Sequence, residues 1–290
     1  MSEKEIDQVT GVETTGHVWD GDIKELNKPL PKWWLWVFYA TVVWAVGYWL
    51  VYPAWPTLSG SYTKGYFDYS QRGQVAEQVA AAKAQQAKYY QEIADTPLDQ
   101  IEQNQELMPF VMAGGAAIFG DNCGPCHGKG GQGGVGYPNL NDDDWLWGGT
   151  PDAIHQTIMH GIRSTDPETR QMQMPRFGLD GILTPDQIRD AAEYVLSLSN
   201  SATDQEAAKR GATIFADNCA ACHGEDGKGN QDVGAPNLTD AIWLYGNKLS
   251  DIEKTIETGR GGVMPFWTGR LDPVTIKMLA VYVHSLGGGK

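Results

Sequence analysis

The stretch Asn122-Cys123-Gly124-Pro125-Cys126-His127-Gly128 occurs a second time in the chain, as Asn218-Cys219-Ala220-Ala221-Cys222-His223-Gly224. Each copy has the pattern C-x-x-C-H, which is the attachment signature of a c-type haem. Two thiols at this spacing can add to the two vinyl groups of one porphyrin, and the following histidine is then held beneath the iron as a proximal ligand. The sequence therefore predicts two covalently bound c-type haems. One is attached to Cys123 and Cys126 with His127 on its iron, and the other to Cys219 and Cys222 with His223.

Three other uses of paired cysteines fit this pattern less well. A structural zinc ion could take four ligands from two C-x-x-C pairs, but zinc gives no reason for a histidine directly after each pair. A thioredoxin-like redox pair requires a βαβ context, which the sequence lacks. A disulfide across two intervening residues is usually strained. Because all four cysteines of the chain lie in the two motifs, haem attachment is the favoured interpretation.

The two motifs belong to a longer internal repeat. Segments that match between the copies are Ile118-Phe119 with Ile214-Phe215, Pro138-Asn139-Leu140 with Pro236-Asn237-Leu238, Trp145-Leu146 with Trp243-Leu244, Gly161 with Gly259, and Tyr194-Val195 with Tyr282-Val283. A duplicated module of this kind predicts two tandem domains, which we place at 108–199 and 203–290. The linker of Ser199 to Ala202 is short, so the two haems are expected to lie close to each other.

A haem that carries electrons needs a sixth iron ligand, and methionine is the usual choice in cytochromes c. Met264-Pro265 in the second module matches Met174-Pro175 in the first. Met172 competes with Met174, which is favoured because it has the following proline and the repeat partner. We therefore expect His127 to pair with Met174, and His223 with Met264.

Other side chains of the modules are weaker candidates for haem contacts. His155 and His160 lie between His127 and Met174, but neither has a repeat counterpart, which disfavours them as ligands. Trp145, Trp243 and Arg260 could reach haem propionates, and core packing is an equal alternative for the two tryptophans.

An uncharged segment precedes both modules. No charged residue occurs from Trp33 to Thr63. The part richest in apolar residues, Trp33 to Val51, would span about 29 Å as a helix, close to the thickness of a bilayer core. We assign residues 1–32 to an N-terminal arm, 33–56 to a transmembrane anchor and 57–107 to a helical linker. Tryptophans and tyrosines at both ends of the anchor are typical of membrane interfaces.

The orientation of the anchor follows from the flanking charges. Lys24, Lys28 and Lys32 precede it, whereas Lys64 is the nearest charge on the other side. The positive-inside rule then places the N-terminus in the cytoplasm and the haem modules in the periplasm of a bacterium, with the anchor in the inner membrane. The long and partly acidic arm argues against a cleaved signal peptide. The net charge of −14 makes nucleic acid an unlikely partner.

Several helix starts are marked by capping residues. Thr184 with Gln187 and Asp272 with Pro273 are expected to begin the last helix of each module. Thr203 with Glu206 is expected to begin the first helix of the second module. In the linker, we expect a helix over Gln74 to Ala94 and another with Thr96 as its N-cap.

The N-terminal arm carries a resemblance to a known family. The stretch Gly16-His17-Val18-Trp19-Asp20-Gly21-Asp22-Ile23-Lys24-Glu25-Leu26-Asn27, which runs into Pro29-Leu30-Pro31-Lys32-Trp33-Trp34-Leu35-Trp36, resembles the N-terminal signature of the dihaem subunit, CcoP or FixP, of cbb3-type cytochrome c oxidases. The resemblance implies a mainly α fold, with one transmembrane helix and two tandem class I cytochrome c domains. It also implies the ligands His127, Met174, His223 and Met264. Such a subunit takes electrons from a donor cytochrome c and passes them to a monohaem subunit, and thence to the haem-copper catalytic subunit.

Two other functions remain open from the residues alone. A dihaem enzyme such as a peroxidase, or a gas sensor, would need one iron with an exchangeable sixth position, and a candidate methionine in both modules argues against it. A free-standing, membrane-anchored electron shuttle differs from an oxidase subunit only in its partners. The favoured hypothesis is an electron-transfer subunit with no catalytic centre of its own.

Overall fold

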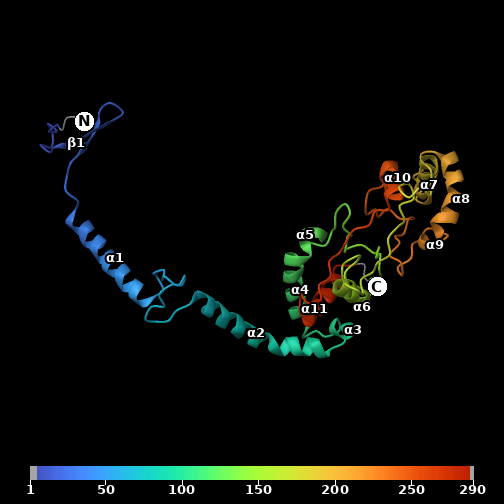
Figure 1. Ribbon diagram of the computed structural model, residues 1–290, viewed down its shortest axis with the longest axis horizontal. Helices are drawn as coiled ribbons and strands as arrows, with labels where there is room; N and C mark the ends of the chain where they lie inside the picture. Colours follow the sequence, from blue (N-terminus) through green and yellow to red (C-terminus); the bar gives the residue numbers. More distant parts are fainter. Residues whose placement is uncertain (1–4, 288–290) are drawn as a thin grey trace. The chain divides into compact units, whose positions relative to one another are not determined.

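The computed structural model describes residues 5–287 and is mainly helical (Figure 1). The chain divides into two compact units at Gln85. The first unit holds a small β-hairpin and helix α1 (Lys32–Val51), and the second holds the C-x-x-C-H modules. Helix α2 (Gln71–Asp95) runs across the boundary, and its bounds confirm the helix expected in the linker.

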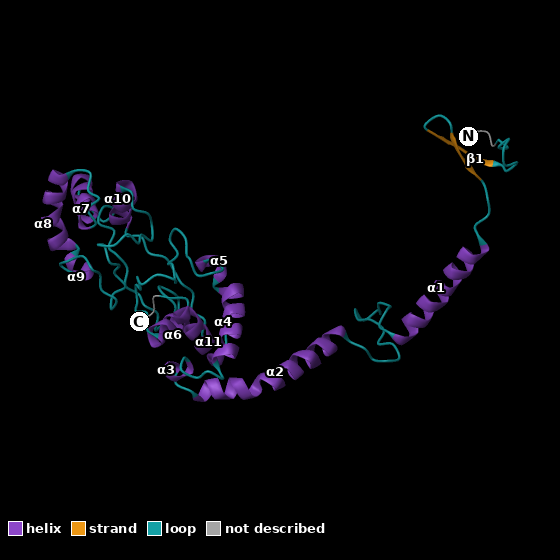
Figure 2. Ribbon diagram, turned by 180° about the vertical axis from the view of Figure 1, so that it is seen from behind, coloured by secondary structure: helices purple, strands orange, loops and turns teal. Residues whose placement is uncertain are grey.

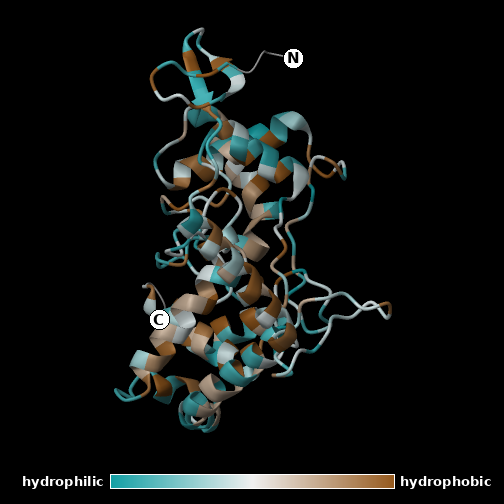
Figure 3. Cartoon of the chain, turned by 90° about the vertical axis from the view of Figure 1, so that its left-hand side faces the viewer, coloured by the Kyte–Doolittle hydropathy of each residue, from teal (hydrophilic) through white to brown (hydrophobic). Residues whose placement is uncertain are grey.

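A β-hairpin in the N-terminal arm was not expected from the sequence. Strands β1 (Thr14–Trp19) and β2 (Ile23–Leu26) pair antiparallel, with Trp19 opposite Ile23, and Figure 2 shows them as the orange strands near the N-terminus. The turn residues Asp20 and Gly21 both have positive φ, as tight hairpin turns require. The strands mix polar and apolar residues without strict alternation (Figure 3). The pair Asp20-Gly21 was therefore the sequence feature from which a hairpin could have been predicted.

Helix α1 matches the segment predicted as the anchor. Within residues 5–287 it is the one helix that is long and apolar enough to cross a membrane. It buries none of its side chains, and Trp33 and Trp36 at its N-terminal end are exposed by 68% and 74%. So large an unpartnered apolar surface is not stable in water, which agrees with contact to lipid. The helix ends where Tyr52 becomes extended ahead of Pro53.

The N-cap expected for the helix after Thr96 is wrong. Only α3 (Leu98–Ile101) forms, with Pro97 at its N-cap, and the Thr96 hydroxyl instead donates to the carbonyl of Glu92 at the end of α2. Lys277 closes this end of α2 by donating to the carbonyls of Ile93, Ala94 and Thr96 at 3.2, 2.8 and 2.9 Å. A cation at a helix C-terminus satisfies carbonyls that have no partner within the helix.

The second unit contains two helical cores. One joins α4 (Met108–Asn122) and α6 (Pro151–His160) to the last helix of the chain, α11 (Pro273–Ser285). The other joins α8 (Gln205–Asn218) and α10 (Leu249–Thr258) to α7 (Pro185–Leu198). Figure 1 shows α4, α6 and α11 in one group and α7, α8 and α10 in another. Each sequence module therefore gives its last helix to the core of the other module.

Two matched contacts show this exchange at the level of side chains. Phe119 of α4 packs on Tyr282 of α11 with ring centroids 5.4 Å apart, and Tyr194 of α7 packs on Phe215 of α8 at 5.0 Å. Gly115 of α4 allows the close approach of α11, because a Cβ there would meet the side chain of Tyr282. In the repeat, Phe119 corresponds to Phe215 and Tyr194 to Tyr282, so the same contact forms twice, each time between modules.

The short connection between α7 and α8 explains the exchange. Consecutive helices joined by few residues pack against each other as an antiparallel pair, which leaves α11 to complete the core around α4. Glu193, which is 0% exposed, fixes the connection by accepting hydrogen bonds from the Thr203 and Asp204 backbone N–H groups and the Thr203 hydroxyl.

The caps of the module helices were predicted with one error. The reciprocal hydrogen bonds of Thr184 and Gln187 confirm the capping box of α7, and Asp272 caps α11 by accepting from the N–H of Thr275. Thr203 was the wrong cap for α8: Asp204 accepts from the N–H groups of Glu206 and Ala207. Thr203 is not available, since its hydroxyl bonds Glu193.

Candidate haem sites

The two histidines of the C-x-x-C-H motifs have the same local geometry. His127 ends α5 (Gly124–His127), His223 ends α9 (Ala220–His223), and the glycine after each has positive φ and turns the chain away. Nδ1 of His127 lies 3.0 Å from the carbonyl oxygen of Pro138, and Nδ1 of His223 lies 3.1 Å from that of Pro236. A carbonyl only accepts, so each Nδ1 carries the proton and donates, which leaves Nε2 with a free lone pair for a metal.

The electrostatics of both rings favour the ligand form. Burial lowers the pKa of His127 and of His223, and the hydrogen bond to the proline carbonyl only partly opposes this shift. The imidazoles are therefore neutral near pH 7, as iron ligation requires. All four cysteines lie in the described part of the chain, where none forms a disulfide, and they range from buried Cys219 to exposed Cys126.

A cavity of about 600 Å³ opens beside His223. Cys219, Cys222 and Met174 line it, together with Ala191 and Val195 of the exchanged helix α7. Apolar walls with a few polar groups and a volume of this order are typical of cofactor sites. Both methionines that line this cavity, Met172 and Met174, come from the first module, and the histidine comes from the second.

Met264 belongs to the other core. It packs against the cluster that contains Phe119, Ile154 and Ile158 and that also contacts Cys123. Its backbone N–H donates to the carbonyl of Ile162, and its carbonyl accepts from the N–H of Ile162, both at 3.0 Å. Gly161 makes this approach possible, because a Cβ there would collide with the carbonyl oxygen of Met264.

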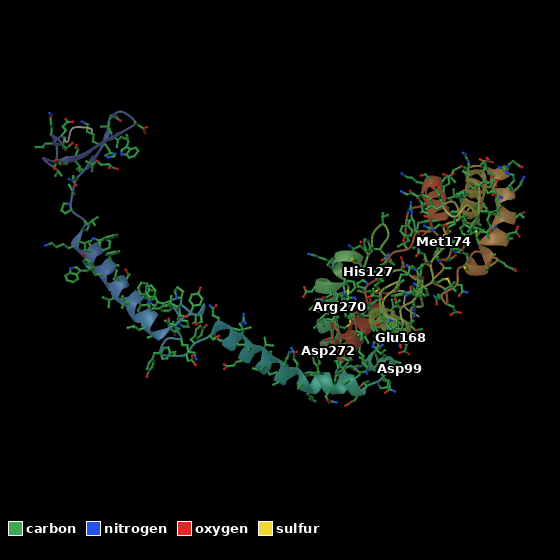
Figure 4. The ribbon with its side chains drawn as sticks, viewed as in Figure 1. Asp99, His127, Glu168, Met174, Arg270 and Asp272 are labelled. Carbon is green, nitrogen blue, oxygen red and sulfur yellow. The ribbon has the colours of Figure 1, made fainter. Side chains whose placement is uncertain are left out.

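The packing of the two methionines favours a pairing that differs from the one expected within each module. Met174 packs against the cluster of Phe215 and Cys219, and Figure 4 shows it on the α7, α10 side of the unit, away from His127 on α5. The expected pairing assumes that each module closes on itself, whereas α7 and α11 each pack in the core of the other module. The preference for Met174 over Met172 agrees with burial, since Met172 is 51% exposed and Met174 is half-buried.

Aromatic side chains that the sequence analysis did not single out cross between the modules. Trp147 fills the space beside Gly234, where a Cβ would collide with its indole, and Tyr245 lies against Gly136. Arg170 stacks over Trp147 and Arg260 over Tyr245, both with 5.2 Å to the ring centroid. Trp147 and Tyr245 occupy matching positions directly after the Trp-Leu pairs of the repeat. This correspondence was the sequence signal that could have identified them.

One buried donor supports a haem in the first site. The indole Nε1 of Trp145 is buried and has no hydrogen-bond partner among residues 5–287, while its ring packs on the core that contains Cys123 and Met264. A buried N–H without an acceptor is rare in native proteins, and a haem carboxylate would supply the acceptor. Trp243, its repeat counterpart, lines the cavity of the second site. The residues present therefore fit a haem at both sites.

The structure also places four other polar side chains of the modules, His160, Arg260, Asp142 and Asp144. His160 bonds Asp166 through Nδ1 at 3.0 Å, so that carboxyl group already engages one of its ring nitrogens. Arg260 lines the cavity of the second site, as do Asp142 and Asp144. Burial, and then the nearby charges of Asp240 and Asp142, raise the pKa of Asp144 to about 6.

An apolar N-terminal helix combined with two sites of c-type haem geometry defines the class of membrane-anchored c-type cytochromes. The N-terminal domain of cytochrome oxidase-cbb3, FixP, matches residues 11–59. Cytochrome c matches residues 112–199, and cytochrome C oxidase, cbb3-type, subunit III matches residues 206–283.

Curated relatives match over nearly the whole chain. The cbb3-type cytochrome c oxidase subunit FixP of Bradyrhizobium sp. (strain ORS 278) is 55% identical, over 99% of this chain and 98% of its own length. Subunit CcoP of Azospirillum brasilense is 53% identical over 100% of both chains. Subunit CcoP of Cereibacter sphaeroides is 52% identical, over 96% of this chain and 95% of its own. The chain belongs to the FixP/CcoP family of cbb3-type cytochrome c oxidase subunits, which confirms the resemblance of its N-terminal arm and its function in electron transfer.

Proposed function

We propose that the chain carries electrons through two c-type haems to other subunits of a cbb3-type oxidase. The observation that supports this proposal is that Met264 packs against the core that Cys123 contacts, while Met174 packs against the core that contains Cys219. A haem with two protein ligands exchanges electrons and leaves no open position for oxygen chemistry. The electrons come from a donor cytochrome c and pass to the monohaem subunit and then to the haem-copper catalytic subunit.

The haem of the first site is attached to Cys123 and Cys126, and that of the second to Cys219 and Cys222. The ligand pairs are His127 with Met264 and His223 with Met174, which cross the modules. The support for this pairing is the grouping of the side chains: Met264 shares a core with Cys123, and Met174 shares a core and a cavity with Cys219. When bound, the two haems supply the redox centres. The protein holds their ligands and excludes water from one face of each.

The charge of the chain fits a basic donor. From Trp33 onward the chain has 18 basic and 29 acidic residues. Long-range attraction would therefore steer a positively charged cytochrome toward the haem modules.

Loss of either haem should remove the relay from the oxidase. Changing both Cys219 and Cys222 to alanine removes the attachment of the second haem, and Cys123→Ala with Cys126→Ala removes the first. In membranes that contain the assembled complex, oxygen uptake with a reduced cytochrome c as donor should fall at least tenfold in both variants. Uptake with an artificial donor that reduces the monohaem subunit directly should persist.

A control separates transfer from assembly. The amounts of the haem-copper and monohaem subunits in the membrane should equal those of the unchanged complex. Full uptake from cytochrome c in the absence of either haem would contradict a relay through both.

We also propose that α1 spans the bacterial inner membrane once, with its N-terminus in the cytoplasm and the haem modules in the periplasm. The support is the lysine-rich N-terminal flank at Lys24, Lys28 and Lys32. A reporter enzyme that is active only in the periplasm should be active when fused after residue 290. Removing the positive charge of the three lysines should lower this activity. An active cytoplasmic reporter at the same position would show that the orientation is reversed.

A further inference from the structure

Arg163 lies between the segment that leads to Met174 and the segment that leads to Met264, which we call the two methionine loops. It has no equivalent in the second module. It follows Gly161-Ile162, and the corresponding position after Gly259-Arg260 is Gly261. Its backbone has a φ of 50°, in the left-handed region that residues with a side chain rarely adopt. Such a conformation persists only where the surrounding structure enforces it.

The guanidinium group of Arg163 contacts both loops at once. Nε donates to the carbonyl oxygen of Gly262 at 2.7 Å, and Nη1 donates to that of Met172 at 2.8 Å. Gly262 stands two residues before Met264, and Met172 stands two residues before Met174. The rigid guanidinium group, with donors in a fork-shaped arrangement, therefore fixes the loop that precedes each of the two proposed haem ligands, Met174 and Met264.

The second module makes room for this contact. A Cβ on Gly261 would lie 3.3 Å from Nε of Arg163 and 3.2 Å from Cδ of Gln173. Both neighbours would have to give way, so a side chain at Gly261 would disturb the fork. Gln173 adds a second link between the loops, because its Nε2 donates to the carbonyl of Gly259 at 3.0 Å.

We propose that Arg163 is a positioning residue that holds both methionine loops together and thereby couples methionine ligation at one haem to methionine ligation at the other. The proposal rests on the crossed ligand pairs of the proposed function. When one loop leaves its iron and shifts, the guanidinium loses one of its two carbonyl partners, and the remaining loop is held less firmly. Release of one methionine therefore favours release of the other, and by linkage the effect is the same in both directions.

Imidazole is a suitable probe, because it competes with methionine for the iron and its apparent affinity reports how firmly each loop is held. Two variants of the full-length haem protein remove the fork: Arg163→Gln, and Arg163→Gly, which suits the positive φ and so preserves the backbone. Each is also placed in the two single-haem backgrounds made by replacing Cys219 and Cys222, or Cys123 and Cys126, with alanine. Arg176→Gln is the matched control, because Arg176 follows Met174-Pro175 but its guanidinium, among residues 5–287, bonds the carboxylate of Asp180 and neither methionine loop.

We expect imidazole to bind roughly tenfold more tightly at both haems in either Arg163 variant, since charge-assisted hydrogen bonds are lost at each loop. Arg176→Gln should leave both affinities unchanged. In the protein with both haems and Arg163, the two imidazoles should bind with positive cooperativity, and this cooperativity should disappear in Arg163→Gly. Tighter binding at one haem only, at neither haem, or noncooperative binding in the unchanged protein would overturn the proposal.

Failure of the proposed ligands can be told apart from failure of the coupling. If a single-haem background with Arg163 intact lacks the far-red absorption band of an iron–methionine bond, the ligand assignment fails. Hydrogen exchange tests the loops without reference to haem: in Arg163→Gly the amides of residues 172–174 and of residues 262–264 should both exchange faster than in Arg176→Gln. Faster exchange in one loop alone would overturn the joint hold.

Discussion

A chain that ends at Asn200 should not form a folded cytochrome domain, although it contains the complete first module of the sequence. It lacks α11, whose Ile276, Met278, Leu279, Val281 and Val283 are at most 5% exposed in the core around α4 and α6. Each buried side chain of this kind contributes roughly 1.5–3 kcal/mol, so their joint loss is comparable to the roughly 5–15 kcal/mol by which a whole domain is stable. Near-ultraviolet circular dichroism should show no fixed packing, and the far-red iron–methionine band should be absent.

A nicked chain provides the control for truncation. Asn200 and Ser201 are exposed in the connection between α7 and α8, so a protease site inserted between them can be cut after folding. The two fragments should then remain together in gel filtration, because each holds a helix of the other's core. Fragments that separate as folded cytochromes, or a folded chain 1–200, would contradict the exchange of helices.

The second large effect concerns the methionines. In the protein that keeps only the haem on Cys123 and Cys126, Met264→Ala should abolish the far-red band and Met174→Ala should leave it intact. In the protein that keeps only the haem on Cys219 and Cys222, the two substitutions should have the opposite effects. The reason is that each methionine packs against the core that the first attachment cysteine of the other module contacts or joins, Cys123 for Met264 and Cys219 for Met174.

Met172→Ala is the matched control in both backgrounds. Its side chain is exposed, and its contact to Arg163 is made by the backbone carbonyl, so the band should persist. A band in the second background that disappears with Met172→Ala alone would assign the ligand to Met172. A band that follows the methionine of the same module would show that the pairing is not crossed.

Local chemistry carries the predictions that depend on short segments of sequence. Cys123, Cys126 and His127 are separated by so few residues that their relation is set within one helical turn, as it is at Cys219, Cys222 and His223. The apolar run that forms α1 and the capping box at Thr184 are likewise properties of short segments. A helix cap was mispredicted where another group bonds the expected capping side chain. Glu193, for example, accepts a hydrogen bond from the hydroxyl of Thr203, which therefore does not cap α8.

The partners of Met174 and Met264 could not be read in the same way. The repeat makes α7 and α11 correspond, so Tyr194 and Tyr282 present the same ring to a phenylalanine of either module, and this match does not distinguish the two pairings. The choice depends on the path of the chain. The short connection after α7, fixed by buried Glu193, brings α7 against α8 and leaves α11 for α4. The sequence by itself thus determined the two C-x-x-C-H motifs, the four candidate iron ligands and the apolar helix. Only the tertiary structure decided that Met264 packs with the core of Cys123 and Met174 with the core of Cys219, because the length of chain between the helices sets which core each last helix joins.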